Sequence, residues 1–438
     1  MPAPDPYLPG HGDDGYRVLH TDLRLDYKVT TNRLDELARL TVVVDQPLTR
    51  LELDLVGLKA SRVTVDGART RHRQTRNKLV VETGARKPGD RMELVIACAG
   101  KPTTVPGVHG AAGWEELTDG VIVASQPQGA PGWFPCNDDA ARKGTYRIEV
   151  RAASGYRVVC NGTLAEHQAS GGTTRWVYEM DQPMSPYLAT VQIGRYTVDE
   201  QPAGVPVEVV HPGRIAVGAG TAFEHQGRMV DHLAELFGPY PFDQYRAVVV
   251  DDVLEIPLEA QGLSTFGRNF ATPTWENERL VVHELAHQWF GNSVTAAQLA
   301  DIWLHEGFAC YSEWLWAEQR AASGITVGTQ QQAALHHAGL KGQQQSTLLR
   351  NPGMRDMFDD WVYKRGALTL HAVRCQVGDE LFFEILKSWT AEHAGGVVTT
   401  DDFIVHCTAR APEHAAKLEK LFDAWLGQTA LPPLPVLR

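Results

Sequence analysis

The sequence has 438 residues, of which 43% are hydrophobic and 21% are charged, and its formal net charge is −12. This length and composition are typical of a globular protein with two or three domains and large buried cores. The acidic balance, without any run of like charges, argues against nucleic acid or an anionic membrane as the main partner, and no apolar stretch approaches the ~18 residues that span a bilayer.

The N-terminus and the cysteines indicate the cellular compartment. The start of the chain contains neither a basic region nor an apolar stretch, so we expect no signal peptide. The six cysteines show no CxxC spacing and are spread thinly over a long chain. This pattern favours free thiols in a reducing compartment over a disulfide framework, and we therefore expect a cytoplasmic protein.

The first part of the chain, from Tyr16 to about Val198, is predicted to be β-structure. Its short segments alternate apolar and polar residues, are rich in β-branched residues and are separated by turns such as Asp66-Gly67. Examples are RLTVVVD, LELDLVG, KLVVET, TYRIEVRA and YRVVCNG. We expect an antiparallel saddle or sandwich of sheets. Asn161-Gly162-Thr163 fits a glycosylation acceptor, but without secretion we interpret Asn161-Gly162 as a hairpin turn.

The second part of the chain is predicted to be mainly helical. After about residue 200 apolar residues recur at helical spacing, and this first helix stops at Gly238-Pro239. One apolar strand, RAVVVDDV, follows, and helices then dominate as far as LEKLFDAWLG. We therefore place an N-terminal β domain at residues 1–199 and a helical domain at residues 200–438. No internal repeat is detected.

The strongest chemical motif lies in the helical part, where Val282 to Asn292 reads VHELAHQWFGN. His283 and His287 are four residues apart, so both imidazoles point from the same face of a helix toward one metal ion. Glu284 lies beside that ion without coordinating it and can accept a proton from water. The alternative is that both histidines are ordinary core or surface residues, and a third ligand decides between the two interpretations.

Glu306 supplies that third ligand. It follows His287 by nineteen residues, in the amphipathic segment DIWLHEGFACYSEWLWAE. This spacing permits a helix, a turn and an antiparallel helix that returns to the same site. Two histidines and one carboxylate suit a catalytic zinc with an open position, although they do not by themselves exclude other divalent metals.

Together these motifs resemble the zinc aminopeptidase family of aminopeptidase N and leukotriene hydrolase, the gluzincin metallopeptidases. HELAHQWFGN and the later WLHEGFA carry the resemblance at the metal site. It extends to WFPCND at Trp133 to Asp138, to LEAQG at Leu258 to Gly262 and to VYKRGALTLHAVR at Val362 to Arg374. The resemblance implies a saddle-like β domain followed by a thermolysin-like, mainly helical zinc metallopeptidase domain, which agrees with the division predicted from periodicity.

The resemblance also implies roles for individual residues. His283, His287 and Glu306 would bind one Zn²⁺ per chain, and Glu284 would be the general base. Tyr363 would donate its hydroxyl to the oxyanion of the tetrahedral intermediate.

Two further residues would hold the free α-amine of the substrate. Glu259 matches the glutamate that family members use for this purpose. Gln126 or Gln128 would add a polar contact to the same amine, and we favour Gln126.

The chain departs from the family pattern at three places. The usual amine-binding loop, Gly-Ala-Met-Glu-Asn, is replaced here by the residues Ile256 to Ala260, which keep only the glutamate. His305 stands where an asparagine is common, and we expect it to support a metal ligand or to lie at the surface rather than to be a fourth ligand. Larger members continue into a C-terminal helical domain, so we expect a short form without it. The final LPPLP resembles a polyproline ligand, but we favour a closing tail.

These features predict a zinc-dependent aminopeptidase that removes the N-terminal residue from peptides. A metalloendopeptidase or peptide-maturation protease on the same scaffold is the main alternative, and it would not need Glu259. Epoxide hydrolysis and a non-catalytic scaffold role are less favoured, because no lipid pocket is indicated and all five key side chains are present. We expect peptides with a free N-terminus as partners, without nucleic acid or membrane. The oligomeric state stays open.

Overall fold

The computed structural model describes residues 4–343 and 347–437. The chain divides into two compact units. The first contains the residues up to Val198 together with Val210–Ile215 and Phe242–Arg268. The second contains Asp199–Val209, Ala216–Pro241 and the residues from Asn269 onward. The domain boundary after residue 199 stays a prediction, and Phe242–Arg268, which follows it in sequence, belongs to the first unit.

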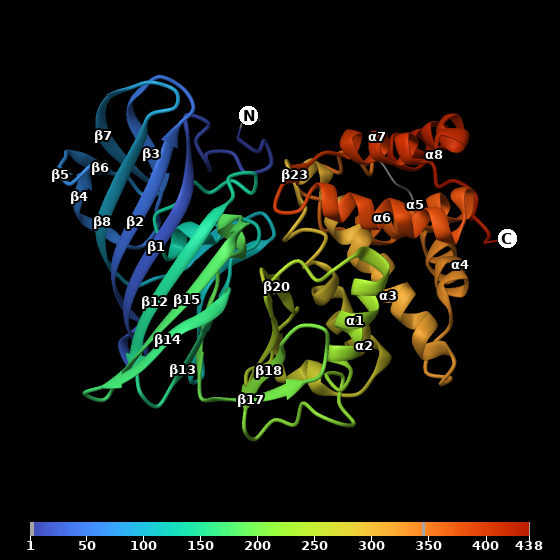
Figure 1. The fold of residues 1–438 in the computed structure, drawn as a ribbon, viewed down its shortest axis with the longest axis horizontal. Coiled ribbons are helices and arrows are strands. Elements are labelled where there is room, and N and C mark those ends of the chain that lie inside the picture. Colours follow the sequence, from blue (N-terminus) through green and yellow to red (C-terminus); the bar gives the residue numbers. More distant parts are fainter. Residues whose placement is uncertain (1–3, 344–346, 438) are drawn as a thin grey trace. The chain divides into compact units, whose positions relative to one another are not determined.

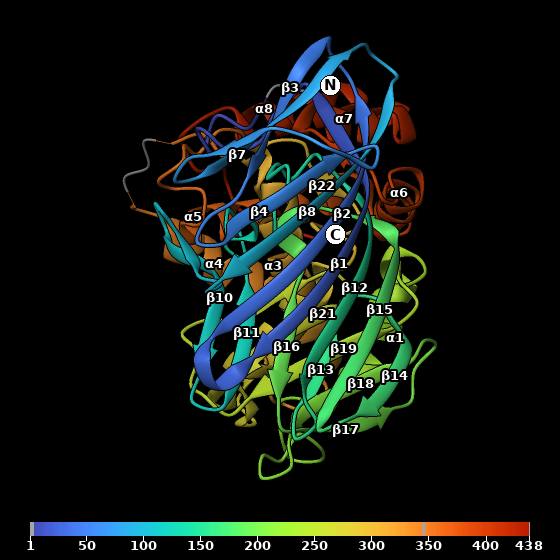
Figure 2. The ribbon, with the colours of Figure 1, turned by 90° about the vertical axis from the view of Figure 1, so that its left-hand side faces the viewer.

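An eight-stranded sheet dominates the first unit. Figure 2 shows most of its strands running side by side, and their order across the sheet is as follows. The strands are β14 (Thr163–Ser170), β15 (Thr173–Met184), β12 (Gly144–Ala153), β1 (Tyr16–Lys28), β2 (Arg33–Val44), β8 (Arg91–Gly100), β4 (Lys59–Val65) and β5 (Ala68–Arg69). Neighbouring strands are antiparallel except β1 and β12, which are parallel. The alternation of apolar and polar residues in the sequence matches the alternation of buried and less buried positions, as in β2.

The described residues also form three smaller sheets of three to five strands. A five-stranded sheet contains, in order, β13 (Arg157–Cys160), β16 (Val191–Gly194), β11 (Gly120–Ala124), β10 (Gly110–Leu117) and β9 (Thr104–Gly107). A three-stranded sheet contains β3 (Leu48–Asp54), β7 (Lys78–Arg86) and β6 (His72–Gln74). A second five-stranded sheet contains β17 (Tyr196–Gln201), β18 (Val207–Pro212), β19 (Tyr245–Val250), β21 (Leu263–Gly267) and β20 (Leu258–Ala260).

A buried apolar cluster explains why Phe242–Arg268 belongs to the first unit. Val248 and Leu263, from this segment, pack in one core cluster with Ile122 and Val159 from the earlier part of the chain. The apolar strand that the sequence predicts at RAVVVDDV is β19, and it is buried at every position. The β-rich N-terminal architecture is therefore confirmed.

The turn at Asn161-Gly162 differs from its prediction. It connects β13 to β14, which lie in different sheets, so the interpretation as a hairpin is wrong. Asn161 is buried, and its amide donates to the carbonyls of Leu188 and Gln261. Gly162 has a φ of +79°, and a Cβ there would lie 2.0 Å from the carbonyl oxygen of Glu179. The turn is therefore fixed by the side-chain bonds of Asn161 and by the close packing of Gly162 on β15, which the sequence pattern does not reveal.

Helices form most of the second unit, and Figure 1 labels them along the sequence. They are α1 (Gln226–Phe237), α2 (Trp275–Ala286), α3 (Trp303–Ala321), α4 (Thr329–Leu340), α5 (Asp360–Val377), α6 (Asp379–Glu392), α7 (Thr400–Arg410) and α8 (Ala415–Leu426). A short parallel pair, β22 (Thr295–Ala296) and β23 (Val397–Val398), joins the segment after α2 to the segment before α7. The predicted helical domain is thus confirmed. None of the helices in the described residues combines the length and apolarity needed to cross a membrane.

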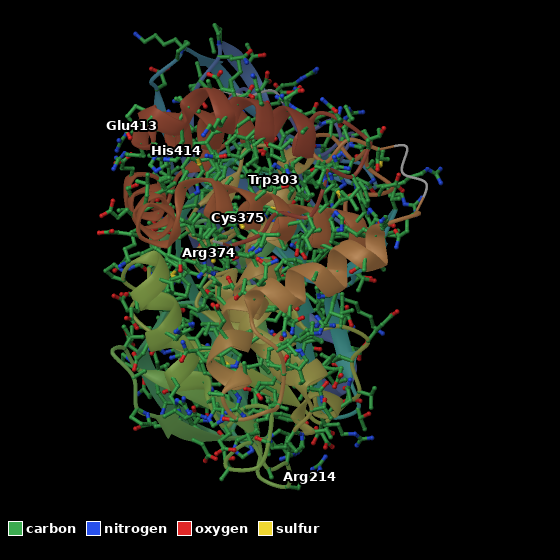
Figure 3. All side chains as sticks on the ribbon, turned by 90° about the vertical axis from the view of Figure 1, so that its right-hand side faces the viewer. Arg214, Trp303, Arg374, Cys375, Glu413 and His414 are labelled. Carbon is green, nitrogen blue, oxygen red and sulfur yellow. The ribbon has the colours of Figure 1, made fainter. Side chains whose placement is uncertain are left out.

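Aromatic residues of α3 and α7 anchor the helical core. Trp303, labelled in Figure 3, is fully buried, and its Nε1–H donates to Oγ1 of Thr400 at 2.8 Å. Phe308 and Phe403 pack edge to face with their ring centroids 5.3 Å apart. The same helix α3 carries Glu306, so this packing fixes the place of a predicted metal ligand.

The eight-stranded sheet buries one carboxyl group, that of Glu36 on β2. Its Cα is paired with those of Leu25 on β1 and Cys98 on β8, and the residue is 5% exposed. Among the described residues neither of its carboxyl oxygens has a hydrogen-bond partner. Burial raises the pKa of Glu36 well above its usual value, because the ionised form is poorly solvated there.

Glu36 therefore makes the stability of the protein depend on pH. A raised carboxyl pKa contributes stability that is complete below the pKa of the unfolded chain and is lost as pH rises toward the folded pKa. Glu36→Gln should therefore become more stable relative to the unchanged protein as pH rises above about 4.5. The difference between their free energies of unfolding should grow by at most about 1.4 kcal/mol per pH unit. Denaturant unfolding between pH 5 and 8 measures this difference, with the exposed Glu82→Gln on β7 as control. A difference that stays constant across this range would contradict the account.

Candidate active site

Helix α2 places both histidines of the HExxH motif on one face. It begins at Trp275, where Thr274 caps the helix by accepting a hydrogen bond from the N–H of Asn277. His287 directly follows the last helical residue and keeps helical dihedral angles, φ −57° and ψ −22°. Its N–H donates to the carbonyl of His283, and the two ring centroids lie 4.9 Å apart. The spacing of four residues thus puts both rings side by side, as predicted.

Helix α3 brings Glu306 to these rings. Its Oε2 lies 3.4 Å from Nε2 of His283 and 3.4 Å from Nε2 of His287. One ligand atom from each of the three residues lies within 4.8 Å of the others, and all three side chains are buried. The structure therefore brings together the three residues predicted to bind a metal.

The opposite ring nitrogens test whether these residues fit a zinc ion. Nδ1 of His283 lies 2.8 Å from Oε1 of Glu313, and Nδ1 of His287 lies 3.0 Å from the carbonyl oxygen of Phe290. Both partners only accept, so each Nδ1 carries a hydrogen and the Nε2 of each ring faces Glu306. Two such nitrogens and one carboxylate are the ligand set of catalytic zinc sites. The residues fit zinc.

Charge points to the same conclusion. Burial lowers the pKa of His283, but its hydrogen bonds with Glu306 and Glu313 outweigh burial and raise the pKa to about 9. Burial alone would raise the pKa of Glu306, and its interactions with both histidines instead hold it well below the usual range. The carboxylate is thus ionised, and the site favours a positive charge at Nε2, which a proton or a metal ion supplies.

Glu313 contacts the predicted ligand His283, a contact that the motif analysis did not predict. It is fully buried on α3, and its second oxygen accepts a hydrogen bond from Nη1 of Arg279 at 3.1 Å. Burial would raise its pKa, but the charges of Lys364, Arg279 and His283 keep it well below the usual range. It follows Glu306 by seven residues, two helical turns, and this spacing on a predicted helix was the signal that could have revealed it.

Glu284, the predicted general base, is buried beside the two histidines. It is 5% exposed and directly follows His283 on α2. Burial raises the pKa of Glu284, and the charges of His283 and His287 oppose this rise only in part. A carboxylate with a raised pKa is a better proton acceptor at neutral pH than an exposed one.

Tyr363, on the first turn of α5, joins the same group. Its ring lies nearly parallel to the imidazole of His283, with the centroids 5.9 Å apart and an interplanar angle of 18°. Two contacts fix α5 against α3 at this point. Nζ of Lys364 donates to Sγ of Cys310, and a Cβ on Gly366 would lie 2.7 Å from Cα of Gly307. The helices can approach this closely only with glycine at both positions.

His305 bonds to backbone, and the expectation that it is not a fourth ligand stays a prediction. Its Nε2 accepts a hydrogen bond from the N–H of Ala296 at 2.7 Å, and the side chain is buried. The surface position that we also considered for His305 is therefore wrong. The ring fixes the segment that follows α2, because Ala296 belongs to β22.

The two residues predicted to hold an amine are joined within the first unit. Nε2 of Gln126 donates to Oε1 of Glu259 at 2.6 Å, and Glu259 is 4% exposed on β20. The amide of Gln128 is instead bonded to the carbonyls of Val105 and Gly110. Of the two glutamines considered, Gln126 is therefore the partner of the glutamate.

Comparisons with known proteins identify the family. The model of the peptidase family M1 domain matches residues 221–425. A leucyl aminopeptidase of Saccharolobus solfataricus is 25% identical over 407 residues, which are 87% of this chain and 50% of the relative. Aminopeptidase M1 of Arabidopsis thaliana is 26% identical over 335 residues, which are 71% of this chain and 37% of the relative. The chain thus spans half or less of the length of these curated relatives.

Solved structures match along the whole chain. The M1 zinc metallopeptidase of Deinococcus radiodurans is 30% identical, covers 99% of both chains and has a TM-score of 0.89. A mutant of that enzyme, with the same identity, coverage and TM-score, was solved bound to a Tyr-Ser-Ala substrate.

The hydrogen bond between Glu313 and His283 generates a prediction about zinc affinity. Glu313→Gln should weaken zinc binding by roughly 10- to 100-fold, because the partner that orients the ligand loses its charge. Competition with a chromophoric chelator measures this affinity in the purified protein. Glu318→Gln, an exposed position on the same helix, is the matched control and should not change it. Equal affinity in both variants would show that Glu313 does not position the ligand.

Proposed function

We propose that this chain, which belongs to the M1 family of zinc metallopeptidases, is an aminopeptidase that removes the N-terminal residue from peptides. The observation that carries the proposal is the arrangement of His283, His287 and Glu306, with both Nδ1 atoms bonded away from the site. The aminopeptidase names of the matched relatives support the reaction class. The tripeptide bound to the related structure supports a peptide substrate.

We assign the chemical steps to three parts of the site. Zinc held by the two histidines and Glu306 would lower the pKa of a water molecule toward neutrality and polarise the scissile carbonyl. Glu284 takes the proton from the attacking water and later passes it to the departing amine. The Tyr363 hydroxyl donates a hydrogen bond to the oxygen of the scissile carbonyl as negative charge develops there.

Recognition of the substrate N-terminus is assigned to Glu259 and Gln126. The carboxylate of Glu259 neutralises the α-ammonium group, and Gln126 holds that carboxylate through its hydrogen bond. Fixing the ammonium sets the cleavage point at one residue from the end of the chain. An endopeptidase would not need such an anchor, and no observation favours that alternative.

We also propose that the protein works in a reducing compartment such as the cytoplasm. All six cysteines are free, and five of them are buried, which supports the expectation of free thiols. The proposed partners are peptides with a free N-terminus.

A panel of aminoacyl reporter substrates tests the proposed function. The unchanged protein should hydrolyse substrates with a free α-amine and leave their N-acetylated analogues nearly intact. Cleavage of internal bonds in N-terminally blocked peptides at a similar rate would instead identify an endopeptidase.

The role of Glu284 generates a prediction about turnover. Glu284→Gln removes the base but no ligand, so we expect kcat to fall by roughly 10²- to 10⁴-fold while zinc content is unchanged. Metal analysis and steady-state kinetics on the same preparation measure both quantities. Glu276→Gln, an exposed position in the first turn of α2, is the control. A variant with near-normal kcat would mean that another group accepts the proton.

The role of Glu259 generates a prediction about selectivity. A hydrogen bond to a charged group contributes about 1.5–3 kcal/mol, so Glu259→Ala should lower kcat/KM for free-amine substrates by roughly 10- to 100-fold. N-acetylated analogues carry no ammonium, and their poor turnover should hardly change. Glu255→Ala, in the exposed loop before β20, is the control. If Glu259→Ala keeps the full preference for free amines, the anchor is a different residue.

A further inference from the structure

A fully buried arginine lies two residues after Tyr363 on α5. The guanidinium of Arg365 donates five hydrogen bonds, and every acceptor is a backbone carbonyl at the end of α8 or just beyond it. The acceptors are the carbonyl oxygens of Trp425 at 2.7 Å, Thr429 at 2.9 Å, Ala424 at 3.0 Å, Gln428 at 2.6 Å and Ala430 at 3.0 Å. All five of these hydrogen bonds thus go to one short stretch of backbone, and three of them come from Nη2.

These carbonyls suit a cation. Ala424 and Trp425 belong to the last turn of α8, where carbonyls lack an intrahelical donor and form the negative end of the helix dipole. Among the described residues no carboxylate forms an ion pair with Arg365. Burial lowers the pKa of Arg365 to about 10, so the group remains charged at neutral pH. Its guanidinium also lies 4.7 Å from the centre of the Trp361 ring.

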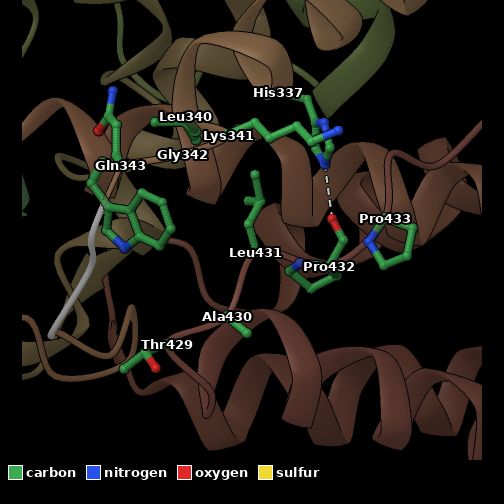
Figure 4. Close-up of a pocket in the computed structure, with 11 residues that line it drawn as sticks. His337, Leu340, Lys341, Gly342, Gln343, Thr429, Ala430, Leu431, Pro432 and Pro433 are labelled. Atoms are coloured by element: carbon green, nitrogen blue, oxygen red, sulfur yellow. Dashed lines mark hydrogen bonds between the residues drawn. The ribbon is translucent and has the colours of Figure 1, made fainter.

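The segment after α8 is held at separate points. Figure 4 shows the hydrogen bond between Nε2 of His337 and the carbonyl oxygen of Pro432, which is 2.8 Å long. Farther along, the side chain of Gln330 donates to the carbonyl of Pro435 and accepts from the N–H of Leu437. A cavity of about 600 Å³ lies beside this segment. This tail segment, residues 428–437, is therefore tied down by a few hydrogen bonds, of which those to Arg365 are the most numerous.

Four successive residues of α5 fix this helix against three other helices. Tyr363 stacks on His283, Lys364 bonds to Cys310, and Gly366 packs on the backbone of Gly307. Arg365 is the member of this turn that ties α5 to α8 and to residues 428–430. Successive residues of a helix project about 100° apart, so one turn makes all of these contacts.

We propose that Arg365 is a positioning residue, which holds the hydroxyl of Tyr363 in place by tying the first turns of α5 to the end of α8 and the tail. This inference rests on the proposed function. Without these hydrogen bonds the first turns of α5 would lose their connection to α8, and the direction of the phenol would be less tightly constrained. Because the hydroxyl acts mainly in the transition state, the loss should affect kcat rather than KM.

A double-mutant cycle tests this inference. Arg365→Met should lower kcat by roughly 10- to 100-fold, as a displacement of about 1 Å can do, with zinc content and KM largely kept. In the Tyr363→Phe background the same substitution should lower kcat by less than about threefold, because the hydroxyl is already absent. Equal losses in both backgrounds would overturn the proposal. Arg365→Lys keeps the charge with fewer donors, so its kcat should lie between those of the unchanged protein and Arg365→Met.

A matched control separates positioning from stability. Arg374, labelled in Figure 3, is a buried arginine on the same helix whose guanidinium bonds to both oxygens of Asp379. Arg374→Met should lower the stability without changing the ratio of kcat to KM beyond about twofold. Equal changes of that ratio in the Arg374 and Arg365 variants would assign Arg365 a structural role only.

Hydrogen exchange gives a readout that does not depend on activity. In Arg365→Lys the amides of residues 363–367 should exchange faster, whereas those of residues 279–287 on α2 should not. Unaltered exchange in residues 363–367 would overturn the inference even if the enzyme is active. Absence of peptide hydrolysis by the unchanged protein would instead reject the proposed function. The two failures are therefore distinguishable, and Arg365→Lys serves if Arg365→Met does not fold.

Discussion

The two hydrogen bonds at Nδ1 of His283 and His287 are the interactions on which the rest of the site depends. A carboxylate holds one ring and a backbone carbonyl holds the other, so the tautomer and the direction of both rings are fixed before any metal binds. Both Nε2 atoms then lie 3.4 Å from the same oxygen of Glu306. A ligand set that is already oriented has less freedom to lose when a metal binds.

The charges around Glu313 extend this constraint into the helical core. Its carboxylate is bonded to His283 on one side and to Arg279 on the other. Lys364, which lowers the pKa of the same carboxyl, directly follows Tyr363 on α5. One buried anion thus connects the proposed metal ligand on α2 with the helix that carries the proposed oxyanion donor. This arrangement explains why α2, α3 and α5 have to pack with little tolerance near the site.

Local spacing made part of this site predictable from the sequence. The separation of four residues determines the common face of His283 and His287, and the amphipathic segment around Glu306 predicts a second helix. The β-rich first part was also predictable, because alternating burial leaves a period-two pattern in each strand. These features depend on contacts within one element or on a motif of fixed spacing.

Other parts could not be predicted because they depend on contacts between distant segments. Glu313 looks like any helical glutamate until it is buried against His283. Arg365 looks like a surface cation, yet its acceptors are backbone carbonyls some sixty residues later in the sequence. Asn161-Gly162 has the composition of a hairpin turn, but its strands enter different sheets. The membership of Phe242–Arg268 in the first unit likewise follows from apolar packing with Ile122 and Val159.

Metal analysis combined with an activity assay tests the central claim most directly. We predict about one zinc per chain in the purified protein, because three protein ligands with an open position form a catalytic zinc site. Removal of zinc by a strong chelator should abolish the release of N-terminal residues, and added zinc should restore it. Full activity in metal-free protein would contradict the account.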